Sequence, residues 1–142
     1  MSQEPAPCAR AASVPSARHP APGKGMAAIT RGQIWWTELD APRGSEPGYR
    51  HPVLVVQRDE VNQSRINTVV VCVLTSNLRL AQAPGNTLLP KRQTGLRKDS
   101  VANASQLLTL NRDELEKLAG KVPVRLMEQV DAGLRWFLSL DS

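Results

Sequence analysis

Two short, valine-rich apolar runs constrain the fold of this chain most strongly. Residues 52–57 contain three valines, and residues 67–74 contain an uninterrupted apolar stretch from Val69 to Leu74. Short continuous apolar runs bounded by Gly, Pro and Asn are typical of buried β-strands. Because a membrane-spanning helix needs about 20 apolar residues, neither run can cross a bilayer.

Other segments between residues 27 and 110 also favour strands. Residues 33–39 are β-prone and contain Trp35 and Trp36. Shorter candidates follow at residues 86–89, 99–103 and 105–110. Strands at this spacing, without helices between them, predict a mainly β domain built as a small antiparallel barrel or sandwich.

The end of the chain predicts helices. Asn111 and Glu114 have the spacing of a capping box, and Gly120 is placed to end the helix that follows. Pro123 suits the first turn of a last helix over residues 122–140. Its apolar stripe, formed by Leu126, Met127, Val130, Leu134, Phe137 and Leu138, predicts a core face, or a dimer or partner surface if it stays exposed.

Residues 1–25 differ in composition from the rest of the chain. Five of the eleven prolines lie there, with many Ala and Ser and one large aliphatic residue, Val14. Such a segment cannot bury enough surface to offset its ordering entropy, so we expect a disordered tail. Alternatively, translation starts at Met26. The globular domain is expected to span residues 26–142.

Charge and composition exclude several classes of protein. The chain has 18 Lys and Arg against 13 Asp and Glu, which permits a polyanionic partner without establishing one. Two cysteines are too few for a disulfide scaffold and lack zinc-ligand spacing, and two histidines cannot build a multi-histidine metal centre. We expect no metal and no cofactor.

Few residues carry chemistry. Ser45 and Glu46 lie in a Gly- and Pro-rich loop. The alternative interpretation is that this loop is only a hairpin turn. Arg50 and His51 follow where that loop enters the second strand; a cation and an imidazole there can bind a phosphate and move a proton, or form an ordinary surface pair.

The strongest apolar run ends in three polar residues, Thr75, Ser76 and Asn77. Their side chains can hold a phosphate, or can cap free backbone groups at the strand end. A basic stretch follows from Arg79 to Lys98, with Arg97 beside Lys98, and favours phosphate contacts. The alternative is that these charges form only a solvated face. Cys72 lies among valines and is most simply a buried apolar residue.

Six motifs in order resemble the MazF/PemK toxins of bacterial type II toxin–antitoxin systems. They are RGQIWW from Arg31, GSE from Gly44, RHPVLVV from Arg50, LTSN from Leu74, KDSV from Lys98 and SQL from Ser105. Each motif is weak alone, but the six occur in the right order, and the resemblance covers residues 30–140, including the closing helix.

The resemblance implies an SH3-like β-barrel of the CcdB/PemK type with a C-terminal helix, and a cytoplasmic homodimer. It also implies a metal-independent endoribonuclease that cuts single-stranded RNA at short sequences and inhibits translation and growth. The 2′-hydroxyl attacks the adjacent phosphorus, leaving a 2′,3′-cyclic phosphate and a 5′-hydroxyl. A MazE-like antitoxin blocks the RNA groove, and operator DNA is bound only through the antitoxin complex.

The resemblance also implies roles for single residues. Thr75 matches the family's threonine at the scissile phosphate, Ser45 and Glu46 match the loop over the groove, and Gln106 matches a polar residue that reads RNA. Tyr49 can stack on a base. The remaining expected RNA contacts are Ser76, Asn77, Arg79 and Lys98.

One position departs from the family. The residue before Pro52 is usually an arginine, but it is His51 here, and Arg50 lies one position earlier. Since alternate strand residues face opposite sides, the two side chains need not enter one pocket. Either Arg50 reaches the phosphate or His51 replaces the arginine. We expect His51 to move the proton and Arg50 to stabilise the charged phosphorane, because an imidazole is a better base near pH 7 than a guanidinium.

Three other functions fit the sequence less well. The first is a gyrase poison on the same fold, the second is a catalytically inactive barrel that acts as a DNA-binding co-repressor with its antitoxin, and the third is an unrelated SH3-like adaptor. The phosphate-binding elements argue against the first, and His51 keeps the second open.

Overall fold

The computed structural model describes residues 28–39 and 50–140. In chain order the elements are β1 (Gln33–Glu38), β2 (Arg50–Val55), α2 (Asp59–Asn62), β3 (Thr68–Thr75), η2 (Leu78–Gln82), β4 (Thr87–Leu89), α3 (Lys91–Thr94), β5 (Ser100–Asn111), η3 (Arg112–Glu114), β6 (Lys117–Lys121) and α4 (Val124–Phe137), where η marks a 3-10 helix. The expected tail, residues 1–25, lies outside the described residues.

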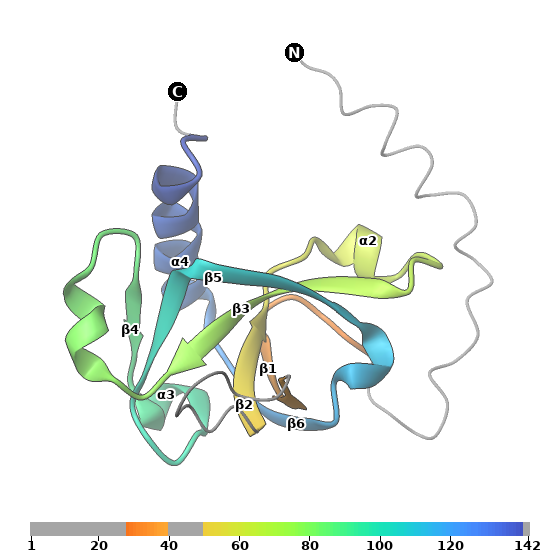
Figure 1. Cartoon of the computed structure of the whole chain (residues 1–142), viewed down its shortest axis with the longest axis horizontal. Coiled ribbons are helices and arrows are strands. Elements are labelled where there is room, and N and C mark those ends of the chain that lie inside the picture. The colour runs from red at the N-terminus through yellow and green to blue at the C-terminus, as the bar shows by residue number, and fades with distance from the viewer. Residues whose placement is uncertain (1–27, 40–49, 141–142) are drawn as a thin grey trace.

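The six strands form one antiparallel sheet in the order β4-β5-β3-β2-β1-β6. The sheet is strongly curled, and α4 stands against one side of it (Figure 1). This is the mainly β, barrel-like fold with a C-terminal helix that the sequence predicts. Among the described helices, none is both long enough and apolar enough to cross a membrane.

The sheet buries side chains on both of its faces. Ile34, Leu54 and Cys72 belong to one apolar cluster, which α4 covers with Leu126, Met127 and Val130. The residues that alternate with them, Trp35, Val53, Val55, Val71 and Val73, form the second cluster with Leu115. Because successive strand residues face opposite sides, these central strands are apolar on both faces, which explains the continuous apolar runs in the sequence.

Two of the expected strands are one in the structure. Residues 99–103 and 105–110 were expected as separate strands, but β5 runs without a break from Ser100 to Asn111. The pairing with β3 changes register where the sequence suggests a break: Leu74 lies opposite Ala102, whereas Cys72 lies opposite Leu107. The extra residues of β5 are taken up in a bulge, so the strand bends without ending.

The prediction of a short helix after Asn111 is wrong. The capping box itself is present, since the backbone N–H of Asn111 donates to Glu114 at 2.7 Å, but the helix stops after one 3-10 turn. Residues 117–121 instead form β6, which pairs with β1. Leu115 is buried in the second cluster, while Leu118 is 42% exposed. Pairing with β1 satisfies the backbone of this segment and outweighs its local helical preference.

The last helix, Val124–Phe137, is shorter than the range of residues 122–140 expected from the sequence. Helix α4 begins after Pro123, which is the N-cap residue and so lies just outside the expected first turn. Leu126, Met127 and Val130 are buried, and Leu134 packs against the same cluster. Phe137 and Leu138, at the end of the stripe, are 42% and 45% exposed. The first four residues of the stripe therefore pack in the core, and the last two do not.

Candidate active site

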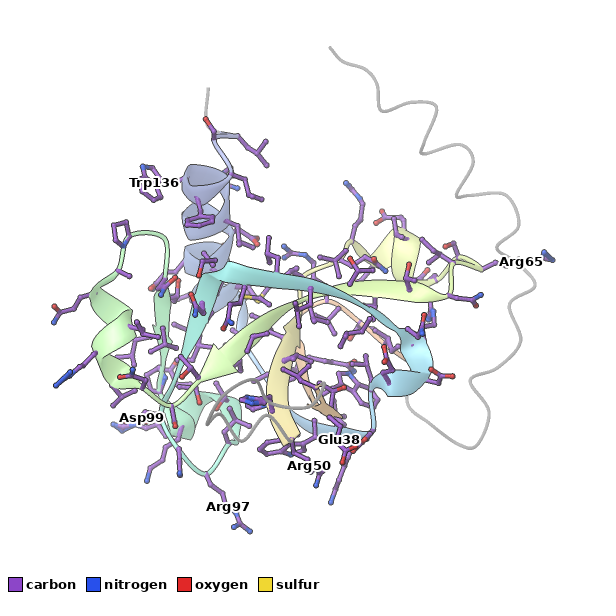
Figure 2. All side chains as sticks on the ribbon, in the orientation of Figure 1. Glu38, Arg50, Arg65, Arg97, Asp99 and Trp136 are labelled. Carbon is purple, nitrogen blue, oxygen red and sulfur yellow. The ribbon has the colours of Figure 1, made fainter. Side chains whose placement is uncertain are left out.

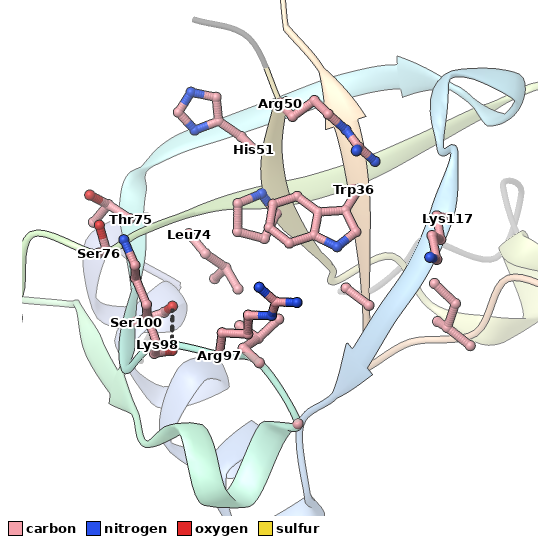
Figure 3. Close-up of a pocket in the computed structure, with 15 residues that line it drawn as sticks. Trp36, Arg50, His51, Leu74, Thr75, Ser76, Arg97, Lys98, Ser100 and Lys117 are labelled. Atoms are coloured by element: carbon pink, nitrogen blue, oxygen red, sulfur yellow. Dashed lines mark hydrogen bonds between the residues drawn. The ribbon is translucent and has the colours of Figure 1, made fainter. Parts of the chain in front are cut away.

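A cavity of about 680 Å³ opens where β2 begins and β3 ends. Its walls come from β1, β2, β6, the end of β3 and the segment between α3 and β5 (Figure 3). The lining residues are Trp36, Arg50, His51, Pro52, Leu74, Thr75, Ser76, Gly95, Leu96, Arg97, Lys98, Ser100, Lys117, Leu118 and Ala119. The volume lies within the range of about 300–1,000 Å³ that is usual for ligand sites.

Arg50 and His51 project from opposite faces of β2. Val53 lies opposite Val73 of β3, and the same antiparallel register, continued by two residues, brings His51 level with Thr75. His51 and Thr75 share the face of Val53 and Val73, because strand side chains alternate. Arg50 lies on the other face. Figure 3 shows His51 and Thr75 toward one side of the cavity and Arg50 toward the other.

The Arg50 side chain is directed toward the β6 edge of the sheet. Its guanidinium carbon lies 5.5 Å from the centroid of the Trp36 ring, and its Nη2 lies 3.7 Å from Glu116 Oε1. Since β2 is flanked by β3 on one side and β1 on the other, these contacts direct Arg50 away from Thr75. Of the two basic groups before Pro52, His51 therefore lies on the face of the threonine.

Thr75 is the last residue of β3 and is half-buried. Its Oγ1 accepts a hydrogen bond of 3.1 Å from the backbone N–H of Asn77. This contact uses a lone pair of the hydroxyl and leaves its hydrogen available to donate into the cavity. A threonine held in this way is a fixed donor for an anionic oxygen.

The cavity is cationic. Arg50, Arg97, Lys98 and Lys117 line it, and no Asp or Glu is among its described lining residues. Arg50 and Arg97 lie at the same end of the molecule, far from Trp136 on α4 (Figure 2). Clustered cations at a concave surface attract phosphate groups and raise their local concentration.

The expected site residues divide into three groups. Arg50, His51, Thr75, Ser76 and Lys98 meet at the cavity. Asn77, Arg79 and Gln106 lie outside its lining. The Asn77 side chain caps η2 by accepting from the backbone N–H of Arg79 at 3.2 Å. Arg79 and Gln106 are exposed, and Gln106 accepts from Asn103 Nδ2 at 3.2 Å. Ser45, Glu46 and Tyr49 lie outside the described residues.

Trp36 and Lys117 line the cavity but were not expected there from the sequence. Trp36 was assigned only to a strand, and Lys117 to a short helix. In the structure they are cross-strand partners on β1 and β6. Nothing in the local sequence around Lys117 indicates that pairing, so the signal for this part of the site lies in the strand register alone.

The buried thiol takes no part in this site. Burial raises the pKa of Cys72 to about 12, and its sulfur lies 3.3 Å from the backbone oxygen of Asn103. A thiol that stays protonated is a poor nucleophile. Cys72 is a core residue, as the valines around it suggest.

The chain is thus a mainly β protein whose curled sheet carries a cationic cavity beside Thr75. The chain belongs to the family described as PemK-like, MazF-like toxins of type II toxin–antitoxin systems, whose family model matches residues 30–138. This confirms the family that the six sequence motifs indicate.

Similar proteins and solved structures support the assignment of the chain to this family. Endoribonuclease MazF6 of Mycobacterium tuberculosis is 48% identical over 112 residues, which are 79% of this chain and 98% of that protein. A solved mycobacterial endoribonuclease in complex with its cognate antitoxin is 25% identical, with a TM-score of 0.62 over 81% of this chain and 99% of that one. MazF of Deinococcus radiodurans is 21% identical, with a TM-score of 0.64 over 80% of this chain and 99% of that one, and supports the fold.

Proposed function

We propose that the chain is the endoribonuclease toxin of a type II toxin–antitoxin system and that it cleaves single-stranded RNA at the cationic cavity without a metal ion. The family and the relatives named endoribonuclease support the activity. The observation that carries the assignment to this cavity is the placement of an imidazole, a threonine hydroxyl and several cations around one space. These groups are what the cleavage of a phosphodiester by its own 2′-hydroxyl requires.

The step proposed is an internal transfer at phosphorus. The 2′-oxygen forms a bond to the neighbouring phosphorus, and the bond from phosphorus to O5′ of the next nucleotide breaks. His51 takes the proton of the 2′-hydroxyl, and the leaving O5′ takes a proton from water. The hydroxide that remains takes the proton from His51, which restores the neutral imidazole. The products are a 2′,3′-cyclic phosphate and a 5′-hydroxyl, so no external nucleophile enters the bond.

Thr75 and the cations stabilise the charge that grows on the phosphorane. The Thr75 hydroxyl is fixed through its bond from Asn77 and donates to a non-bridging oxygen. Lys98 lines the same part of the cavity and balances the negative charge (Figure 3). Arg50 is directed toward Trp36 and Glu116. We therefore place Arg50 at a neighbouring phosphate rather than at the scissile one, which revises the role expected from the sequence.

The partners proposed are a cognate antitoxin and a second copy of the chain. A mycobacterial structure with an antitoxin, 25% identical to this chain, supports the first. The homodimer rests on the family resemblance. The apolar side chains exposed at the end of α4 support it, because Trp136 and Leu140 are 56% and 64% exposed there. Sedimentation of the purified protein tests the dimer. We place the activity in the cytoplasm, where the RNA is.

The test of the proposed function is cleavage of a long single-stranded RNA in excess EDTA, with both new ends characterised. The wild-type protein is expected to make discrete cuts that carry a cyclic phosphate and a 5′-hydroxyl. The His51→Ala and Thr75→Ala variants are expected to lose cleavage while keeping the wild-type circular dichroism and melting temperature.

A parallel assay separates the alternative functions. If the folded wild-type protein cuts no RNA, the proposal is wrong. Inhibition of DNA supercoiling by gyrase would then support a gyrase poison, and operator binding together with the antitoxin would support a co-repressor. Cleavage that stops when EDTA is added would contradict the metal-independent chemistry alone.

A further inference from the structure

Trp36 presents an indole to the cavity at some distance from the groups proposed for cleavage. It lies opposite Pro52 of β2 on one side and opposite Lys117 of β6 on the other. Cross-strand partners point to the same face of a sheet, so Trp36, Pro52 and Lys117 share the face of Arg50. Thr75 and His51 belong to the other face, and the two groups meet in one cavity (Figure 3).

We propose that Trp36, Lys117 and Arg97 form a nucleotide subsite that binds one unpaired nucleotide next to the cleaved bond. The base stacks on the Trp36 indole, and its phosphate contacts Lys117 and Arg97. This inference rests on the proposed function, because the ligand is a nucleotide of the RNA that is cut.

The indole is half-buried, which holds the ring in place while one part of it lines the cavity. Stacking of a base on a fixed aromatic ring is favourable for every base, because each base has a π-face. Within the residues that the structure describes, the indole Nε1 of Trp36 donates no hydrogen bond, whereas that of Trp35 donates to Gln33 at 2.9 Å. Trp36 is therefore the indole of this strand that can serve a ligand.

Arg50 marks the place that the base would take. Its guanidinium lies 5.5 Å from the centre of the Trp36 ring, so a planar, π-stacking group already covers the indole in the absence of RNA. Its ion pair with Glu116 is long, at 3.7 Å, and both side chains are more than 40% exposed. Exposed ion pairs of this kind contribute little, so a base can displace the guanidinium at small cost.

The cations around the indole fit a phosphate. Lys117 is adjacent to Trp36 on the neighbouring strand, and Arg97 reaches the same cavity from the segment between α3 and β5. No carboxylate is among the described lining residues, although Glu116 lies just outside them. An aromatic ring with cations beside it is the usual arrangement for single-stranded nucleic acid.

The experiment is a double-mutant cycle between the protein and a modified oligonucleotide. Once the cleavage sequence is mapped, a 2′-O-methyl oligonucleotide of that sequence, which cannot be cut, is the probe. An abasic residue replaces one nucleotide at a time, and the dissociation constant is measured by fluorescence anisotropy for wild type, Trp36→Ala and Trp36→Phe. Ile66→Ala, at an exposed apolar residue outside the cavity lining, is the control.

The subsite predicts that Trp36→Ala weakens binding about 5- to 150-fold and that Trp36→Phe largely restores it, as expected for stacking. At one position only, the abasic probe should bind wild type and Trp36→Ala equally weakly, so that the two losses are not additive. A neutral methylphosphonate beside that position should likewise cancel the effect of Lys117→Gln.

Two results would overturn the subsite while leaving the proposed function intact. One is a wild-type dissociation constant in a folded Trp36→Ala protein that still cleaves RNA. The other is additive losses at every abasic position. If Trp36→Ala does not fold, the test uses Trp36→Phe and Lys117→Gln with the same modified probes. The subsite is then overturned if the losses from the protein substitution and from the probe modification are additive at every position. A wild-type protein that neither binds nor cuts RNA removes the proposed function, and the subsite with it.

Discussion

The guanidinium of Arg50 pairs with the carboxylate of Glu116 at 3.7 Å and lies over the Trp36 ring. The pair holds Arg50 toward the β6 side of the sheet, whereas Thr75 lies on β3, on the other side of β2. The arginine closest in sequence to the family's usual position is thus engaged by protein groups, and His51 occupies the face of the threonine.

Glu116→Gln should strengthen RNA binding. The substitution removes the charge that holds Arg50 and leaves a neutral group of the same size. An exposed pair contributes little, so we expect KM for RNA to fall about two- to fivefold, with little change in kcat. The control is Glu128→Gln, at an exposed position of α4. It removes a charge remote from the cavity and should leave KM nearly unchanged. Equal effects of both variants would show that only net charge matters.

His51→Ala should lower kcat more than Arg50→Ala does. Loss of one general acid–base group costs about 100- to 10,000-fold, whereas loss of a phosphate contact outside the reacting centre chiefly raises KM. Single-turnover cleavage at saturating protein separates the two effects. Full activity of His51→Ala together with an inactive Arg50→Ala protein would reverse the assignment.

His51→Arg distinguishes an imidazole from a simple cation. A guanidinium keeps its charge at all pH values near neutrality, whereas an imidazole gains and loses a proton there. We expect His51→Arg to cut RNA about 100- to 10,000-fold more slowly than wild type in single-turnover assays, because a guanidinium supplies the charge but does not accept the proton of the 2′-hydroxyl. Cleavage by His51→Arg at the wild-type rate would exclude His51 as the proton acceptor.

Thr75→Ser should keep most activity, and Thr75→Ala should not. Both hydroxyl side chains can accept from the Asn77 N–H and donate to the phosphorane. Removing one such donor from a transition state typically costs about 100- to 1,000-fold in kcat. Similar activity of the alanine and serine variants would mean that the hydroxyl does not contact the reacting phosphate.

The Cys72 thiol should be unreactive in the native protein. With its pKa raised to about 12 from 9.0, about one molecule in 10⁴ carries a thiolate at pH 8. In a Cys8→Ala background, iodoacetamide should label Cys72 only after denaturation. Because the raised pKa favours the protonated thiol, its contribution to stability is complete below pH 9 and is lost as the pH rises toward 12. Rapid native labelling would contradict this burial.

Gly133→Ala should destabilise the fold. A Cβ at this position would lie 2.2 Å from the backbone oxygen of Gly85, so α4 would have to move away from the turn before β4. Over-packing of this kind costs about 1–3 kcal/mol and outweighs the gain of about 1 kcal/mol in helix propensity. A lower melting temperature is expected, while Ala132→Ser on the exposed surface of α4 should change it little. An unchanged Gly133→Ala protein would show that the contact is loose.

The sequence predicts the parts of this protein that local patterns determine. The valine runs identify β2 and β3, because central strands are apolar on both faces. The motifs around Arg50 and Thr75 identify the family and one side of the cavity. Patterns of this kind lie within a few residues of one another, so they can be recognised without the fold.

The rest depends on pairing between distant segments. Residues 117–121 have local helical signals but become β6 by pairing with β1, and the same pairing brings Lys117 beside Trp36. The bulge that keeps β5 continuous also depends on its partner, β3. Strand register therefore determines the Trp36 side of the cavity, and no short motif carries that information.

The most direct test of the account is a single 2′-deoxy substitution at the nucleotide on the 5′ side of the mapped cut. The 2′-oxygen is the nucleophile in the proposed reaction, so the substituted RNA should bind with nearly unchanged affinity and should not be cut at that bond. A deoxy substitution one nucleotide further along should leave the cut in place. Cleavage of the 2′-deoxy bond at the wild-type rate would contradict attack by the 2′-hydroxyl, and with it the roles given to His51 and Thr75.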